Sequence, residues 1–260
     1  MPSDIIQIRS QPGIKRDGTR FEGDAYVDGQ WVRWQRGLPR KIGGYRQINN
    51  FVGGIVRQMS TQAQNNFTYT HLGYGAGLEQ LTVDTLGNTS APVDRTPVGY
   101  TGGDDFTWQF DAIYDGAGAA SSLVAVATNT SMDISNNVDQ QVYIGDYYDT
   151  TALTDISGIL VSGGVCALHP YLFVYGTNGY VQWSDANDPT NFSTGDAGDA
   201  WIDSSKVVKM LPLRGGGQSP AGLIWTLDRL IRVSYTGGTD VFAFDTITAS
   251  SSILAVNGII

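Results

Sequence analysis

The sequence predicts an all-β protein, and three observations carry this prediction. Short runs of Val, Ile, Leu, Tyr, Phe and Trp alternate with Gly, Asn, Asp and Pro, the pattern of strands and turns. No window of about 12 residues carries apolar side chains at the helical period without a Gly or Pro break. Glycine makes up 33 of the 260 residues, well above the usual ~7%, and follows no collagen period.

The clearest strands are apolar runs bounded by turn residues. They cover residues 67–72, 122–128, 141–144, 171–175, 180–184, 223–227, 230–235 and 241–247. Residues 176–179 (Gly-Thr-Asn-Gly) and Asp228-Arg229 each separate two such runs by a short polar stretch. We therefore predict two β-hairpins at these turns, since Gly and Asn tolerate the positive φ angles that tight turns need.

A repeat of about 50 residues predicts the architecture. The apolar run that begins at Leu123 recurs at Leu172 and Leu223, which are 49 and 51 residues apart, and an earlier run begins at Phe67. Four strands in such a period are typical of a β-propeller blade. We predict an extended arm over residues 1–50 and a partial propeller over 51–260, with blades at about 51–105, 106–156, 157–203 and 204–248. A β-sandwich is the alternative, but the continuous apolar run 123–127 favours blades.

The end of the sequence is apolar. Residues 253–260 carry no charged side chain, and roughly four blades fit after residue 51. Natural C-termini are usually solvated. We therefore expect this chain to be the first part of a longer one.

Charge is distributed unevenly along the chain. Residues 1–60 hold 10 Lys or Arg against 5 acids, a net charge of +5, whereas the remaining 200 residues hold 6 against 20, a net charge of −14. Between Arg95 and Lys206 there are 14 Asp and no Lys or Arg. This asymmetry indicates docking between complementary charges, although an ordinary solvated surface is the alternative. The acidic part is unsuited to binding DNA, because such binding needs phosphate neutralisation.

The sequence lacks the motifs of common enzymes and metal sites. It contains no nucleophile elbow, no phosphate-binding loop and no His-Glu-x-x-His. We interpret His71 and His169 as structural imidazoles and the single cysteine, Cys166, as a buried apolar side chain. The acidic segments 185–188 and 196–199 lack the spacing of a calcium loop. We expect no enzyme activity, no cofactor and no metal, and no membrane span, since no apolar run approaches ~18 residues.

Four segments resemble tail proteins of short-tailed bacteriophages. They are QPGIKRDGT at residues 11–19, FEGDAYVDGQWVRW at 21–34, GLPRKIGGY at 37–45 and VQWSDANDPTNF at 181–192. The family is the tail nozzle or hub, also called tail tubular or packaged-DNA stabilisation protein. The resemblance implies a β-propeller that assembles as a hexameric ring below the portal and adaptor and continues the DNA exit channel.

The resemblance also implies partners and a location. The partners are further copies of the chain, the adaptor or portal ring, tail fibres or tailspikes, and genomic DNA that passes through without specific binding. The protein is then a structural component of the virion tail, present in the host cytoplasm during assembly. Two other functions stay open: a carbohydrate-binding or hydrolytic propeller, and a β-sandwich protein that decorates a capsid.

Two sets of residues are candidates for this role. We expect the basic arm to make assembly contacts through Lys15, Arg16, Trp31, Arg33, Trp34, Arg40 and Lys41. We expect the acidic stretch to contribute to the channel wall through Asp104, Asp105, Asp146 and Asp149, because a wall without Lys or Arg holds phosphate weakly. The alternative is that these Asp residues lie in exposed turns on the outer wall.

Overall fold

The computed structural model describes residues 11–15, 25–43, 52–104, 106–114, 121–129, 141–213, 220–251 and 253–258. The all-β prediction is confirmed: the described residues form strands and contain no α-helix. Their only helices are single 3-10 turns at Thr177–Gly179 (η2) and Val256–Gly258 (η3), so none is long enough to cross a membrane. Contacts divide the chain into two compact units, Met1–Ile48 and Asn49–Ile260.

The first unit contains two small sheets. β1 (Gln11–Ile14) lies parallel to β2 (Ala25–Tyr26), and β3 (Val32–Gln35) pairs antiparallel with β4 (Leu38–Lys41). Arg36 and Gly37 form the turn of the β3–β4 hairpin, with φ angles of 52° and 78°. Positive φ at both positions is typical of the turn whose twist matches the two strands. The Trp34 ring lies 5.0 Å from the Tyr26 ring, so one face of the hairpin packs within the unit.

The second unit contains four antiparallel sheets of four strands, and in each sheet the neighbouring strands follow chain order. The first sheet is β5 (Val56–Gln64), β6 (Phe67–Tyr74), β7 (Gly77–Asp84) and β8 (Val93–Asp94), and the second is β9 (Phe106–Tyr114), β10 (Ser121–Asn129), β11 (Gln141–Asp146) and β12 (Thr154–Asp155). The third is β13 (Gly164–Leu168), β14 (Tyr171–Tyr175), β15 (Tyr180–Trp183) and β16 (Gly198–Trp201), and the fourth is β17 (Val207–Pro212), β18 (Ala221–Thr226), β19 (Leu230–Tyr235) and β20 (Phe242–Thr248).

Successive sheets pack face to face through shared hydrophobic clusters. Strand β10 shows the arrangement: Leu123 and Ala125 pack in a cluster with Leu78 of the first sheet, whereas Val124 packs in a cluster with Leu172 of the third. Side chains alternate between the faces of a strand, so both faces of β10 are covered. Strand β14 lies in the same way between the second and fourth sheets. This double burial explains the continuous apolar runs in the sequence.

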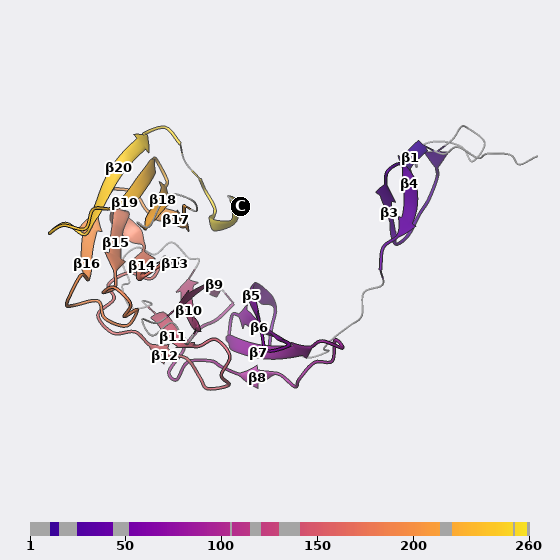
Figure 1. The fold of residues 1–260 in the computed structure, drawn as a ribbon, viewed down its shortest axis with the longest axis horizontal. Coiled ribbons are helices and arrows are strands. Elements are labelled where there is room, and N and C mark those ends of the chain that lie inside the picture. Colours follow the sequence, from indigo (N-terminus) through magenta and orange to yellow (C-terminus); the bar gives the residue numbers. More distant parts are fainter. Residues whose placement is uncertain are drawn as a thin grey trace, which may run out of the picture. The chain divides into compact units, whose positions relative to one another are not determined.

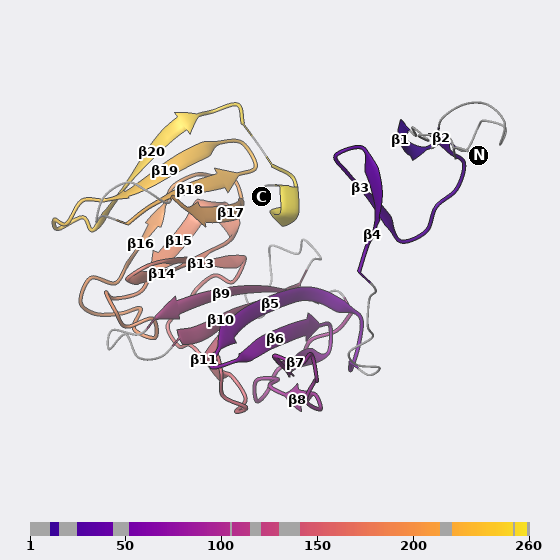
Figure 2. The ribbon, with the colours of Figure 1, turned by 45° about the vertical axis from the view of Figure 1, so that its right-hand side comes forward.

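The first strands of the four sheets lie next to one another in series. β5 contacts β9, β9 contacts β13, and β13 contacts β17. Within the second unit, Figure 1 shows the four sheets following one another around an arc, with these first strands on its concave side and β8, β12, β16 and β20 on its outside. Figure 2 shows the same succession from another side.

The strands pair within the segments that the 50-residue repeat predicts. The sheets span residues 56–94, 106–155, 164–201 and 207–248. β10 pairs with β9 and β11, and β18 pairs with β17 and β19. Both predicted hairpins are present, as β14–β15 and β18–β19. The alternative of two sheets packed as one sandwich does not describe these four separate sheets.

Candidate assembly and channel surfaces

The residues predicted for assembly lie mainly on the surface of the first unit. Lys15, Arg33, Arg40 and Lys41 are exposed, as is Trp31, whose exposed fraction is 56%. Trp34 is half-buried because it packs on Tyr26. Within the first unit, Trp34 is therefore partly covered, and Trp31 is more exposed. Arg16 lies outside the described residues.

The β3–β4 hairpin places two of these arginines together. Arg33 in β3 lies directly opposite Arg40 in β4, and Val32 lies opposite Lys41. Since side chains alternate along a strand, Arg33 and Arg40 share one face, while Val32 and Trp34 share the other. Arg33 and Arg40 are exposed, and Val32 and Trp34 are half-buried, whereas Pro39 and Lys41, which share the face of Val32 and Trp34, are exposed.

The residues predicted for the channel wall fall in two places. Asp146 ends β11, and Asp149 lies in the connection from β11 to β12. The Asp146 carboxylate accepts hydrogen bonds from the backbone N–H groups of Tyr148 and Asp149, at 2.7 and 3.2 Å, so the two acids belong to one turn. Asp104 lies instead before β9, and its carbonyl accepts a hydrogen bond from Arg57 of β5 at 2.7 Å. Asp105 lies outside the described residues.

A buried arginine holds the turn that carries Asp146 and Asp149. Arg95 is fully buried; its Nε donates to the carbonyl of Thr151 and its Nη2 to the carbonyl of Asp146, both at 2.8 Å. Arg95 follows β8 of the first sheet, whereas the turn belongs to the second sheet. The guanidinium therefore ties these two sheets together by hydrogen bonds to backbone carbonyls.

The same guanidinium contacts a buried histidine. Arg95 Nη1 lies 3.0 Å from Nε2 of His71 in β6. An arginine only donates, so the histidine nitrogen accepts and the ring carries its proton on Nδ1. Burial, together with the neighbouring Arg95 charge, lowers the pKa of His71 to about 3. His71 is thus a structural imidazole, as expected, whereas His169 is exposed, with its ring 6.4 Å from that of Tyr114.

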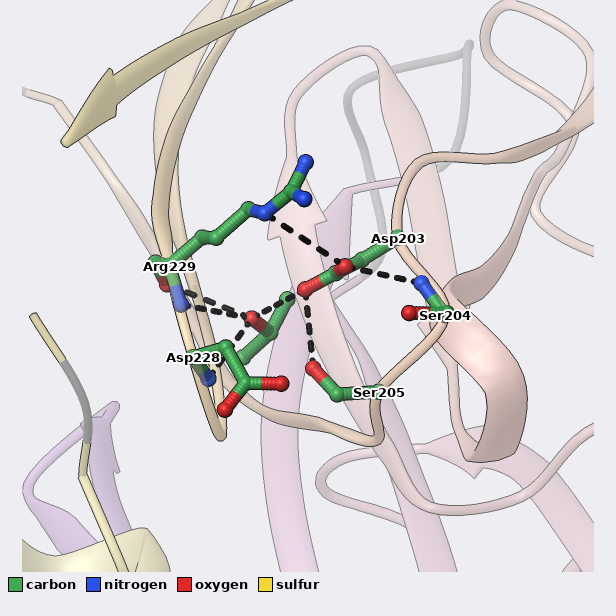
Figure 3. Close-up of polar contacts among 6 residues, drawn as sticks. Asp203, Ser204, Ser205, Asp228 and Arg229 are labelled. Atoms are coloured by element: carbon green, nitrogen blue, oxygen red, sulfur yellow. Dashed lines mark hydrogen bonds and ion pairs between the residues drawn. The ribbon is translucent and has the colours of Figure 1, made fainter. Parts of the chain in front are cut away.

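Polar anchors also join the later sheets. Asp111 of β9 accepts a hydrogen bond from the backbone N–H of Ala167 in β13 at 2.7 Å. Burial raises the pKa of Asp111 despite this bond. In the β16–β17 connection, Asp203 accepts hydrogen bonds from the hydroxyls of Thr226, at 2.5 Å, and Ser205, at 2.8 Å (Figure 3). Thr226 ends β18, so this second anchor fixes the fourth sheet.

Asp203 is almost fully buried and is held ionised. Its side chain is 2% exposed, and the Nε of Arg229 lies 3.7 Å from its carboxylate. Burial opposes ionisation, but the hydrogen bonds from Thr226, Ser205 and the Ser204 backbone, with the Arg229 charge, outweigh burial and hold the pKa of Asp203 below its ordinary value. A carboxylate with a lowered pKa is a weak base. The cluster therefore stabilises the β18–β19 turn.

The acidic turns in the third sheet are built by local hydrogen bonds. Asp185 accepts hydrogen bonds from the backbone N–H groups of Ala186 and Asp196, and Asp188 accepts them from Thr190. These are turns in which an Asp side chain bonds nearby backbone groups. Within the described ranges, no group of three His, Cys, Asp or Glu side chains is arranged to hold a metal ion.

Sequence reasoning did not identify Arg95, Asp111 or Asp203 as anchors. The bonds by which each residue joins distant elements reach partners between 23 and 56 positions away, so no local spacing reveals them. The only available signal was the isolation of Arg95, which is the last basic residue before Lys206.

Comparison with known proteins gave no match: no family model matches the sequence, and no significant match was found among curated proteins or solved structures. The likeness to phage tail proteins therefore depends on the four sequence segments alone.

Proposed function

We propose that this chain is a structural subunit of the tail nozzle or hub of a short-tailed bacteriophage. The proposal begins with the four segments that resemble that family, three of which fall between residues 11 and 45. Of these, residues 25–34 and 37–43 lie in or beside β2 and the β3–β4 hairpin. In this role the chain assembles into a ring of identical copies, which we expect to be hexameric, around the path of the DNA.

A propeller-type body is the fold that we propose for the second unit. The observation that carries it is the contact of the first strands in series, β5 to β9 to β13 to β17, on one side of four stacked sheets. In a propeller, the first strand of each blade lies nearest the central axis, and the blades pack face to face. The buried faces of β10 and β14 support the same arrangement.

The two units suit different tasks in such a ring. The exposed basic residues of the first unit suit contacts with acidic neighbours, either another copy or the adjoining adaptor ring. The acidic second unit suits a surface past which DNA slides, because few cations are present to bind phosphate. We keep Asp104, Asp146 and Asp149 as candidates for that surface; all three are exposed.

Electron microscopy of the purified full chain tests the proposal. Negatively stained particles should show rings with a central channel, and class averages should show six-fold symmetry. A uniform monomer across the micromolar range would contradict the ring. A monomer that cleaves a polysaccharide would instead support the alternative of a hydrolytic propeller.

A further inference from the structure

The outward face of the β3–β4 hairpin carries two positive charges directly opposite each other, and no acid among the described residues pairs with them. Arg33 and Arg40 are directly opposite each other across the two strands, and both are exposed. Side chains in this relationship have Cβ atoms about 5 Å apart, and like charges there destabilise the strand pair. The two ion pairs found in the described residues involve Arg229 and Arg232 instead. An anion bound to both guanidinium groups would relieve the repulsion.

The hairpin holds this face outward. Val32 and Trp34, on the other face, are half-buried, and Trp34 packs on Tyr26. Turning Arg33 and Arg40 inward would expose the Trp34 ring, which costs hydrophobic free energy. The face therefore presents two planar guanidinium groups side by side on a regular hairpin, an arrangement suited to paired carboxylates.

The second unit offers a complementary surface, which we call the acidic rim: Asp94 and Asp155. Both are exposed. Asp94 is in β8 and Asp155 in β12, the outer strands of the first and second sheets. The nearby Arg95 is buried and uses its guanidinium on backbone carbonyls and His71, so it offers no guanidinium at the surface to these acids.

The two units as a whole also carry net charges of opposite sign. Residues 1–48 hold 9 basic and 5 acidic residues, a net charge of +4. Residues 49–260 hold 7 and 20, a net charge of −13, and together the units give the −9 of the whole chain. Opposite charges of this size favour association between the first unit of one copy and the second unit of another.

We propose that the face formed by Arg33 and Arg40 binds the acidic rim of a second copy of this chain. The inference depends on the proposed ring and names the contact that joins its subunits. In a closed ring, each copy presents its hairpin to one neighbour and its rim to the other, so every copy makes both contacts. Nucleic acid is the less suitable partner, because the body attached to the hairpin carries 20 acidic residues against 7 basic ones and repels phosphate.

Charge reversal in the full chain tests the contact. Arg40→Glu should raise the concentration for half-assembly at least tenfold, measured by sedimentation velocity, and Arg33→Glu with Arg40→Glu should raise it further. The matched control is Arg36→Glu, which makes the same change of charge in the turn of the same hairpin and should shift assembly less than twofold. Circular dichroism verifies that each variant is folded.

Complementary variants make the test specific to this pair of surfaces. A chain with Asp94→Lys and Asp155→Lys should also assemble poorly alone. Mixed with the Arg33→Glu, Arg40→Glu chain, it should form rings in which the two chains alternate. At one junction the reversed hairpin of the first chain meets the reversed rim of the second, and at the next the unchanged hairpin of the second meets the unchanged rim of the first. Rings formed by the mixture and by neither variant alone would support the contact, and their absence would overturn it.

Other outcomes distinguish a failure of the proposed contact from a failure of the proposed ring. If the wild type forms rings and Arg40→Glu leaves their assembly unchanged, the proposed contact is wrong and the proposed ring is still supported. If the wild type is monomeric at every concentration, both are wrong. If Arg40→Glu abolishes binding of a 20-base-pair duplex and leaves self-association unchanged, the face binds nucleic acid and the proposed partner is wrong.

Discussion

Arg95 and His71 meet in the interior between the first two sheets, with Nη1 of the guanidinium 3.0 Å from Nε2 of the imidazole. Both side chains are 0% exposed. The Arg95 guanidinium also donates hydrogen bonds to the carbonyls of Thr151 and Asp146. The guanidinium is thus the donor at the centre of a polar junction that holds the two sheets together.

Replacement of Arg95 should destabilise the second unit strongly. In Arg95→Met, the carbonyls of Thr151 and Asp146 lose their donor inside the protein, and each such loss costs about 1–3 kcal/mol. We expect the free energy of unfolding to fall by about 2–5 kcal/mol in urea titrations. Arg57→Met is the matched control, because its guanidinium donates to Asp104 in an exposed hydrogen bond. Equal losses in the two variants would contradict the role of Arg95.

The buried imidazole should make stability depend on pH. The folded pKa of His71 is about 3, whereas an unfolded histidine has a pKa of about 6.5. Between these values the unfolded chain binds a proton that the folded chain does not, so stability falls as the pH falls from about 6.5 towards 3, by at most about 1.4 kcal/mol per pH unit. His71→Gln, which keeps an acceptor for Arg95, should flatten this slope in urea titrations between pH 6 and 4. A slope unchanged from the wild type would show that His71 is not responsible.

Asp203 should contribute over a lower pH range. Its folded pKa lies below the ordinary value, so its contribution is fully present above about pH 4, the unfolded value, and is lost as the pH falls through the folded pKa. At pH 7, Asp203→Asn should lower the free energy of unfolding by about 1–3 kcal/mol, since it weakens hydrogen bonds to a charged acceptor. The control Asp245→Asn breaks the exposed pair with Arg232 and should cost at most about 1 kcal/mol. A larger loss of unfolding free energy for Asp245→Asn than for Asp203→Asn would contradict the role of Asp203.

The apolar part of the fold could be predicted from the sequence. The run 123–127 has no polar residue because β10 is covered on both faces, and its recurrence near residues 172 and 223 marks the third and fourth sheets. β5 was not predicted, because its inward face is polar: Ser60 lies 2.6 Å from the hydroxyl of Tyr147, and Gln62 accepts a hydrogen bond from Ser121. Hydrophobic periodicity cannot reveal a strand that packs through hydrogen bonds between distant residues.

The candidate surfaces were predictable only as regions. Composition identified a basic arm and an acidic body, but the opposition of Arg33 and Arg40 depends on the register of the hairpin. That register is set by the turn at Arg36 and Gly37, which is neither Asn-Gly nor Asp-Gly, the strongest signals of such turns. The burial of Arg95 was equally hidden, since its partners lie 15 to 56 residues away in the sequence.

Close packing of the first two sheets gives a further prediction. A Cβ added to Gly73 would lie 2.5 Å from Cγ of Trp108, a buried side chain of β9. Gly73→Ala should therefore displace the Trp108 ring and lower the free energy of unfolding by about 1–3 kcal/mol. Thermal unfolding and tryptophan fluorescence measure the two effects. Gly103→Ala, where no atom lies within 4 Å of the added Cβ, should change neither.

The candidate channel wall can be tested by charge reversal at Asp104 and Asp149. Both are exposed, and they belong to different connections, before β9 and after β11. If these positions face the DNA, Asp104→Lys with Asp149→Lys adds cations to the wall, and counterion release should make duplex DNA bind the ring in a salt-dependent way. Screening limits the effect to about 8–10 Å at physiological salt, so a response requires that the duplex pass close to these side chains.

The matched control reverses two exposed acids of the fourth sheet, Asp228→Lys with Asp240→Lys, and so changes the net charge equally. Fluorescence anisotropy of a labelled duplex at about 50 and 200 mM salt measures binding, and ejection from assembled particles measures transport. We expect tighter binding at low salt and slower ejection for the Asp104, Asp149 variant only. Equal binding by both variants would reflect net charge alone, and no gain by the first variant would assign Asp104 and Asp149 to the outer wall, where exposed turns commonly carry Asp.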